Sequence, residues 1–202
     1  MKVIIASHNA GKIKVFNEMF APLDMEVQSL LDFPELAEVE ETGTTFEANA
    51  RLKAEQIAKE LNCIALADDS GLVVPALNGE PGIYSARYSG EPKDDTRNNQ
   101  KLLDRLKEVN ASDRSAYFVS CIVVAHPKMA SLVVEGRAHG EILEELRGVE
   151  GFGYDPLFYV ESEESTFAEI PLSVKNKISH RANATAQLLD LLPSWLEELK
   201  QA

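Results

Sequence analysis

Two adjacent aspartates that follow a short apolar run have the clearest chemical potential in this sequence. Asp68 and Asp69 come after the run 63–66 and Ala67, and directly before Ser70 and Gly71. The run predicts a short buried strand, and strand side chains alternate between faces, so the two carboxylates should have different partners. A carboxylate pair at the end of a buried strand needs a cation or strong donors to compensate its charge. We expect a turn at Ser70 and Gly71 and a divalent-metal and general-base site; an ordinary acidic turn is the alternative.

An acidic loop and the helix after it supply further charged groups. Glu40 and Glu41 lie in the loop, and a helix is predicted over 45–61. Asn49 and Lys53 are one turn apart on a face of this helix distinct from its apolar stripe. Because the loop and the aspartate strand bracket the helix, the two acid pairs can meet. The alternative is a set of surface acids and a solvated lysine.

The N-terminal segment combines a predicted strand over 2–6, a short polar turn, and a helix over 12–20. This arrangement directs backbone amides and a helix N-terminus toward an anion. The turn is not a Walker loop, because it contains one glycine and lacks the required spacing. A lysine at a helix start opposes the helix dipole, so Lys12 suggests a bound phosphate, with a solvated lysine as the alternative. The candidate phosphate-binding residues are Ser7, His8, Asn9, Ala10, Gly11 and Lys12.

A glycine-flanked aromatic residue stands in the C-terminal third of the chain. Gly151 and Gly153 flank Phe152, and Tyr154 and Asp155 follow. The glycines free the backbone to turn, so the ring of Phe152 can be exposed and stack on a flat ligand such as a base. An ordinary glycine-aromatic turn that packs on the core is the alternative.

A cationic segment precedes the last long helix, which is predicted over 182–192. Ser179 is suited to cap this helix, but His180 and Arg181 occupy its first turn, where the dipole favours acids. Such a start is expected if an anion or a carbonyl-rich ring docks there. Pro193 is expected to end the helix, and a short amphipathic helix should close the chain.

The remaining sequence predicts a framework of strands and helices. Strands are expected at 72–74, 115–125 and 130–139, and the last two should form an antiparallel hairpin. Thr44 and Asp95 are the expected N-caps of two helices.

Composition limits the function classes that fit this chain. Its 202 residues, 45% of them apolar, can bury a full core, and without a linker or repeat they predict a single domain over 1–202. No apolar run approaches the roughly 18 residues of a membrane span. The net charge of −13 argues against nucleic-acid and acidic-membrane partners. Cys63 and Cys121 both lie in apolar runs, which favours a reduced, cytoplasmic setting.

Together these stretches resemble the inosine triphosphate pyrophosphatase family, the XTP/dITP diphosphatases. They follow the family's order over nearly the whole chain, and they are the stretches 7–12, 40–43, 45–50, 67–72, 82–88, 151–156 and 178–181. His8 departs from the family pattern, in which a small Thr- or Gly-like residue is expected. Phosphate binding by backbone amides does not depend on that side chain.

The resemblance implies a fold, an activity and a set of site residues. The fold would be an elongated α/β one, with a mixed central sheet, flanking helices and two lobes around a nucleotide-binding cleft, usually as a homodimer. The activity would be Mg²⁺-dependent hydrolysis of ITP, dITP and XTP to the monophosphate and pyrophosphate, which cleanses the nucleotide pool. Asp69 would be the general base, and Glu40 and Asp69 would hold the metal, with Glu41 and Asp68 as further candidates. The implied substrate-binding residues are the turn from Ser7 to Lys12, Lys53, Ser70, Phe152, Gly153, Tyr154, Asp155, Lys175, His180 and Arg181.

Physical chemistry independently favours this assignment. A triphosphate would be repelled by a chain of net charge −13 unless a hard cation and local lysines compensated it. Magnesium prefers carboxylates together with phosphate oxygens. Rejecting adenine requires donors directed at a 6-oxo group, which His180, Arg181 or nearby amides can supply.

Three other functions remain open from the sequence. A phosphohydrolase with an aspartyl nucleophile would need two aspartates on one side of a loop, whereas Asp68 and Asp69 are adjacent. A pyrophosphatase of the septum-inhibitor type would have a similar topology and pyrimidine substrates. A nucleotide-binding regulator without catalysis would not need the full set of acids.

Overall fold

The computed structural model describes residues 2–21, 25–37, 39–109 and 112–202, and within them the chain forms one sheet and flanking helices. The strands are β1 Lys2–Ile5, β2 Glu26–Ser29, β3 Ile64–Val73, β4 Ser115–His126, β5 Met129–Ile142, β6 Phe158–Val160 and β7 Ser165–Thr166. The α-helices are α1 Ala10–Phe20, α2 Phe46–Leu61, α3 Asp95–Glu108, α4 Leu172–Ile178 and α5 His180–Gln201.

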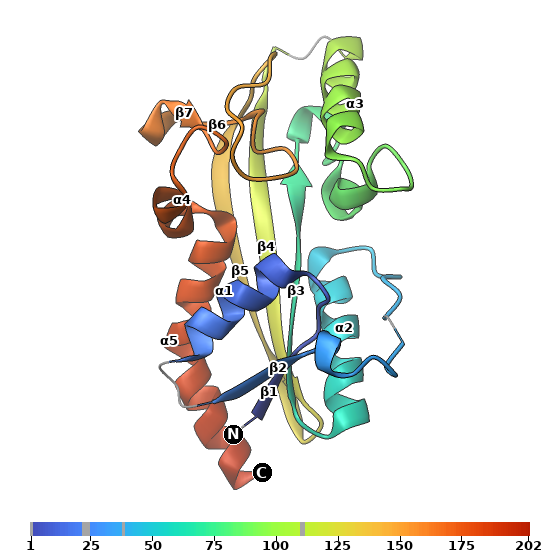
Figure 1. The fold of residues 1–202 in the computed structure, drawn as a ribbon, viewed down its shortest axis with the longest axis vertical. Helices are drawn as coiled ribbons and strands as arrows, with labels where there is room; N and C mark the ends of the chain where they lie inside the picture. Colours follow the sequence, from blue (N-terminus) through green and yellow to red (C-terminus); the bar gives the residue numbers. More distant parts are fainter. Residues whose placement is uncertain (1, 22–24, 38, 110–111) are drawn as a thin grey trace. The chain divides into compact units, whose positions relative to one another are not determined.

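The seven strands are arranged in the order β2-β1-β3-β4-β5-β6-β7 (Figure 1). β1 is parallel to both β2 and β3, whereas β6 is antiparallel to both β5 and β7. The predicted α/β class with a mixed central sheet is therefore confirmed.

The chain folds as two compact units. The first takes its described residues from Met1–Asp69, Cys121–Glu135 and Ala184–Ala202, and the second consists of Ser70–Ser120 and Gly136–Asn183. Each unit has its own apolar core. The expectation of a single domain over 1–202 stays a prediction.

In the first unit the strands bury both of their faces. On β3, Ile64 and Leu66 pack with side chains of α1 and α5, whereas Ala65 and Ala67 pack with side chains of α2. Figure 1 shows α2 on the opposite side of these strands from α5. Fully burying a large apolar side chain stabilises a fold by about 1.5–3 kcal/mol, so both layers hold β3 firmly in register. This register decides where the next side chains of β3 point.

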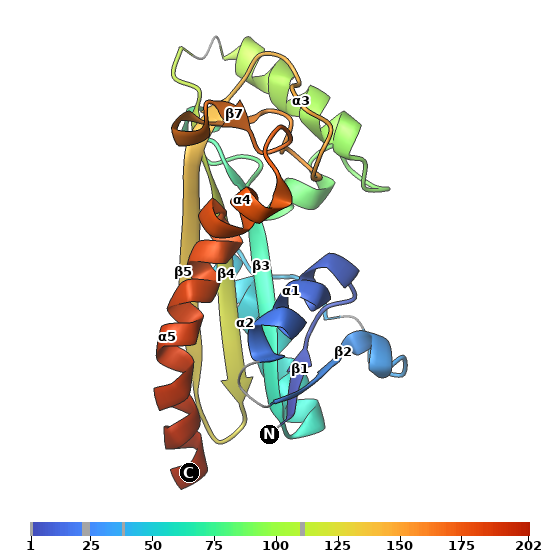
Figure 2. The same ribbon diagram turned by 60° about the vertical axis from the view of Figure 1, so that its left-hand side comes forward.

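The hairpin of β4 and β5 is confirmed, with a two-residue turn at 127–128. Helix α5 runs along β5 (Figure 2). In the first unit the side chains of Gln187 and Trp195 donate to the backbone carbonyls of Glu135 and Ala130, at 2.7 and 2.9 Å. These bonds occupy backbone acceptors of β5 that could otherwise pair with another chain.

The second unit is built around α3 and a group of aromatic rings. Leu102 and Leu106 of α3 are fully buried in its core. Phe118 lies with its ring centre 4.6 Å from that of Phe158 and 6.0 Å from that of Phe167. These contacts support the loops that follow β5 and β6.

The predicted turn at Ser70 and Gly71 is wrong, because β3 continues through both residues to Val73. Gly71 is buried in the strand and is not among the described glycines with positive φ. The predicted separate strand at 72–74 is therefore the end of β3. The strand can continue because the charges of Asp68 and Asp69 are compensated inside the fold.

The predicted break at Pro193 is also wrong, since α5 is continuous to Gln201. Pro193 is exposed, whereas Leu192 and Trp195 are buried. The ring therefore lies on the solvent side, where water can satisfy the carbonyl that loses its helical partner.

Two predicted helix caps are each displaced by one residue. Thr45, rather than Thr44, accepts from the N–H of Ala48, at 3.0 Å. Asp94, rather than Asp95, accepts from the N–H of Arg97, at 2.9 Å. In both pairs the neighbouring side chain has similar capping chemistry, which is why the pattern could not separate them.

Candidate active site

The two aspartates of β3 lie on opposite faces of the strand and have different partners, as predicted. Both are buried in the first unit. Asp68 follows the face that meets α1 and forms an ion pair with Lys12 at 2.8 Å. Asp69 follows the face that meets α2, where it lies 3.2 Å from the ammonium of Lys53 and 3.3 Å from the amide nitrogen of Asn49. Strand alternation thus assigns each carboxylate to a different helix.

Both lysines also converge on one backbone oxygen. The carbonyl of Asp68 accepts from Lys12 Nζ at 3.0 Å and from Lys53 Nζ at 3.2 Å. β1 ends at Ile5, and the last bond between the two strands here runs from Ala6 to the carbonyl of Leu66. The Asp68 carbonyl points the same way two residues later, beyond the end of β1, so side chains replace the missing strand. Two cations are thereby held at one point beside a buried carboxylate.

Glu41 completes this cluster, and Glu40 does not contribute its side chain to it. Glu41 Oε1 lies 2.7 Å from Lys53 Nζ. Glu40, which the family resemblance implies as a metal ligand, is exposed. We therefore define the acid–lysine cluster as Lys12, Glu41, Lys53, Asp68 and Asp69.

The electrostatics of the cluster favour a basic carboxylate. Burial raises the pKa of Asp69 above its ordinary value, Lys53 opposes this rise, and the nearby charge of Glu41 adds to it. Burial by itself would lower the pKa of Lys53, but Asp69 and Glu41 outweigh burial and raise that pKa. Lys53 therefore stays charged while Asp69 is a stronger base than an exposed aspartate.

Asn49 is a buried residue beside the cluster, and it is not among the site residues predicted from the sequence. Its amide nitrogen donates to Asp69, and its Oδ1 accepts from the N–H of Gly43, at 2.8 Å. A Cβ at Gly43 would lie 2.6 Å from that oxygen, so the loop can approach this closely only with glycine. The spacing of Asn49 and Lys53 by one helical turn was the available signal.

In the predicted phosphate-binding turn, some polar side chains form hydrogen bonds within the turn itself. Asn9 Oδ1 accepts from the N–H of Lys12 and caps α1, which begins at Ala10 rather than at Lys12. Ser7 Oγ accepts from the N–H of Asn9, at 3.0 Å. His8 and Gly11 are exposed. The turn thus presents the N-terminus of α1 to solvent with Lys12 beside it.

In the second unit the aromatic loop is held from within. Phe152 is 63% exposed, and its N–H donates to Asp155 Oδ2 at 2.9 Å. Asp155 also forms an ion pair with Lys175, whose ammonium lies 5.1 Å from the centre of the Phe152 ring. Tyr154 is buried, and its hydroxyl donates to the carbonyl of Ser85 at 2.7 Å. The loop therefore exposes the ring of Phe152, and Tyr154 anchors the loop.

The start of α5 brings three further predicted residues into the second unit. His180 is buried, and its ring is stacked on Phe118 with 4.9 Å between the ring centres. Arg181 Nη2 lies 3.3 Å from Ser70 Oγ. Ser179 caps the helix as predicted, because its hydroxyl accepts from the N–H of Ala182. We define Ser70, Phe152, Asp155, Lys175 and Arg181 as the ring-binding group, named for the role that the sequence predicts for this region.

Among the described residues there is no group of three or more His, Cys, Asp or Glu side chains placed to hold a metal ion. Magnesium does not require such a group, because it is commonly bound by one or two carboxylates together with water and substrate phosphates. Glu41 and Asp69 share Lys53 and offer hard oxygen donors of this kind. The donor set therefore fits magnesium bound together with a phosphate.

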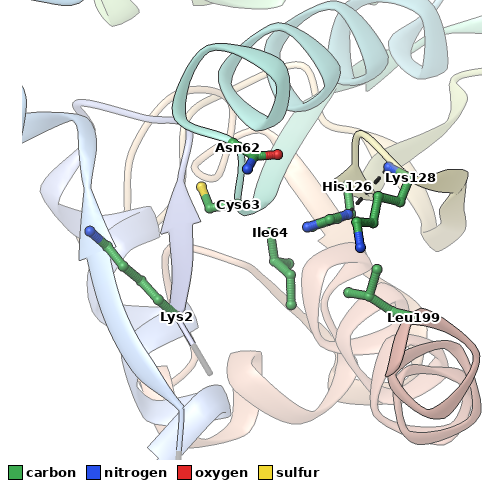
Figure 3. A pocket seen from close by; sticks show the side chains of 7 residues that line it. All are labelled: Lys2, Asn62, Cys63, Ile64, His126, Lys128 and Leu199. Atoms are coloured by element: carbon green, nitrogen blue, oxygen red, sulfur yellow. Dashed lines mark hydrogen bonds between the residues drawn. The ribbon is translucent and has the colours of Figure 1, made fainter. Parts of the chain in front are cut away.

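A separate cavity of about 380 Å³ lies in the first unit (Figure 3). It is lined by Lys2, Asn62, Cys63, Ile64, His126, Lys128 and Leu199, none of which belongs to the acid–lysine cluster. It adjoins the start of β3 and the C-terminal end of α2, whose dipole disfavours anions. We do not assign substrate to it.

Comparison with known proteins identifies relatives of this chain. A family model described as the Ham1 family matches residues 3–191. A protein of Bacillus anthracis named dITP/XTP pyrophosphatase is 50% identical over 196 residues, which cover 96% of this chain and 97% of the relative. A protein of the same name from Listeria innocua is 52% identical over 198 residues, with 98% of each chain covered.

Solved structures agree with this relationship. The Ham1 protein of Staphylococcus aureus has a TM-score of 0.88 and 47% identity, covering 98% of this chain and 99% of that one. A HAM1 protein from Coxiella burnetii has a TM-score of 0.92 and 41% identity, covering 96% and 99%. The resemblance inferred from the sequence is confirmed, and the chain belongs to the Ham1 family.

Proposed function

We propose that this protein hydrolyses deaminated purine nucleoside triphosphates (ITP, dITP and XTP) to the monophosphate and pyrophosphate, and so removes them from the nucleotide pool. The observation that carries the proposal is the pair of lysines, Lys12 and Lys53, held at the Asp68 carbonyl beside the buried carboxylate of Asp69. Cations for a polyanion and a base for water thus occur together in one unit. The names of the relatives from Bacillus anthracis and Listeria innocua support the same activity.

Four residues of the acid–lysine cluster, together with the neighbouring Asn49, bind phosphate and prepare the attacking water in this proposal. Lys12 and Lys53 bind phosphate oxygens, assisted by the N-terminus of α1. Asp69 takes the proton of the attacking water at a carboxylate oxygen, and its burial makes it a better acceptor. Asn49 holds Asp69 in one orientation through the bond to its Oδ2. Asp68 fixes Lys12 from the other face of the strand.

Glu41 and Asp69 are the proposed ligands of a magnesium ion, and the sequence-based choice of Glu40 is retained only as an alternative. When bound, magnesium neutralises phosphate charge and lowers the pKa of bound water. The chain's own contribution is the pair of hard carboxylates next to Lys53.

Removing magnesium with a chelator should lower the activity. We expect excess EDTA to lower turnover of ITP at least about tenfold, because the metal supplies several kcal/mol of charge stabilisation, and added Mg²⁺ should restore it. Pyrophosphate release measured with and without chelator checks this, and full turnover in excess chelator would contradict a metal requirement.

The ring-binding group of the second unit is proposed to receive the nucleoside end. The exposed ring of Phe152 can stack on the base. Arg181 is a donor suited to a 6-oxo group, whereas adenine would present a donor at that position and leave the arginine poorly paired. We also propose that the protein acts as a homodimer in the cytoplasm. Within the described ranges, none of the helices qualifies as a membrane span.

The placement of Asp68 and Asp69 argues against a phosphohydrolase with an aspartyl nucleophile. An aspartyl nucleophile works with a second aspartate on the same side, and these two lie on opposite faces of β3 with different partners. Trapping a phosphoenzyme would revive this alternative.

A substrate panel tests the proposed function directly. We expect kcat/KM for ITP and XTP to exceed that for ATP and for pyrimidine triphosphates by at least about a hundredfold, as expected for a site that hydrogen-bonds a group of the correct base. A preference for pyrimidine triphosphates would favour the septum-inhibitor type, and nucleotide binding without turnover would favour a regulator.

Substitution of Lys53 should mainly weaken substrate binding. Lys53→Ala removes a phosphate-binding cation, so KM for ITP should rise roughly tenfold, as for loss of one charged hydrogen bond. Arg51→Ala is the matched control, because Arg51 lies on α2 and its two ion pairs with Glu47 and Glu55 are at the surface. Steady-state kinetics would contradict the assignment if both variants kept the wild-type KM.

A further inference from the structure

Both backbone groups of Gly153, in the second unit, are held by α3. The N–H of Gly153 donates to Asp95 Oδ2 at 2.8 Å, and its carbonyl accepts from Asn99 Nδ2 at 2.9 Å. Asp95 and Asn99 are one helical turn apart on α3, so the helix itself fixes the spacing of acceptor and donor. Gly153 has a φ of +62°, a conformation that glycine adopts readily. The helix therefore holds both backbone polar groups of one residue of the aromatic loop.

The preceding residue is held from the other side of the loop. The N–H of Phe152 donates to Asp155 Oδ2, and its carbonyl accepts from the N–H of Asp155, at 2.9 and 3.3 Å. Together with the bonds from α3, every backbone polar group of Phe152 and Gly153 has a partner. The ring carried by this fixed backbone is nevertheless 63% exposed. A ring ordered in advance binds a flat ligand with less loss of conformational entropy.

We propose that Asp95 and Asn99 are positioning residues for the nucleoside end of the substrate. They orient the ring of Phe152 through Gly153 and need not touch the ligand themselves. Asn99 is only 5% exposed, which suits a supporting role rather than a contact with substrate. The inference rests on the proposed function, because it assumes that Phe152 stacks on the base.

The test compares kinetics at the two ends of the substrate. Asn99→Ala and Asp95→Ala should each raise KM for ITP by roughly fivefold to tenfold, the effect of about one hydrogen bond, and leave kcat within about twofold. Inhibition by inorganic triphosphate, which has no base, should be unchanged in both variants. Asp95→Asn keeps an acceptor oxygen and should recover most of the wild-type KM. Gln100→Ala is the control, because Gln100 is an exposed neighbour on α3.

Hydrogen exchange gives a readout that needs no substrate. Asp95→Ala should speed exchange of the peptide containing Gly153 by roughly tenfold, because that amide loses its acceptor.

The outcomes separate this inference from the function on which it rests. Failure of the wild-type protein to hydrolyse ITP would overturn both. Wild-type turnover with an unchanged KM in both alanine variants would overturn the positioning role alone. If inhibition by inorganic triphosphate weakened as much as ITP binding in the alanine variants, the positioning role would also be overturned, because the effect would then not be confined to the nucleoside end.

Discussion

Replacing Asp69 with asparagine should lower kcat for ITP by at least about a hundredfold while the protein still folds. The substitution keeps the shape of the side chain but removes its charge and its basicity. General-base catalysis contributes on the order of 10²–10⁴-fold, and loss of a proposed metal ligand would add to this. Steady-state kinetics and circular dichroism on the purified variant check both parts of the expectation.

Asp68→Asn is the matched control, since it changes the same functional group one residue away on the other face of β3. Asp68 pairs with Lys12 rather than with Lys53 and Asn49, so this variant should lose less kcat than Asp69→Asn. Near-wild-type kcat in Asp69→Asn together with an inactive Asp68→Asn would mean that the base has been assigned to the wrong aspartate.

Replacing Lys12 with methionine should destabilise the protein by about 2–4 kcal/mol, because the substitution removes the ion-pair partner of a buried carboxylate. As a solvated lysine, Lys12 would contribute less than about 1 kcal/mol. However, the carboxylate of Asp68 is fully buried, and Lys12 is its ion-pair partner at 2.8 Å. Urea unfolding of the variant measures the change in the free energy of unfolding.

A double-mutant cycle assigns this effect to the ion pair. In the Asp68→Asn background the carboxylate that pairs with Lys12 is absent, so Lys12→Met should cost less than about 1 kcal/mol. The same cost in both backgrounds would show that Lys12 stabilises the fold through packing rather than through its charge.

Strand periodicity was enough to predict that Asp68 and Asp69 have separate partners. It could not predict that β3 continues past them, because the compensating lysines come from α1 and α2, distant in sequence. The carboxylates of Asp68 and Asp69 can lie inside a strand because Lys12 and Lys53 are beside them. The predicted turn failed for that reason.

The parts of the site that sequence reasoning missed depend on burial. Asn49 resembles an ordinary polar helix residue until the approach of Gly43 and Asp69 is known. Asp95 was expected to cap α3, but its neighbour Asp94 does so, and Asp95 instead holds Gly153. The family resemblance implies a binding role for both Phe152 and Tyr154, and of these two only Phe152 is exposed. Contacts between distant segments decide all three cases.

The most direct test of the central claim is product analysis after incubation of the wild-type protein with ITP and Mg²⁺, followed by ³¹P NMR. Hydrolysis between the α- and β-phosphates predicts IMP and pyrophosphate in equal amounts, with no IDP, and loss of this reaction in Asp69→Asn. Formation of IDP and inorganic phosphate, or an ITP signal that does not change, would contradict the proposed activity.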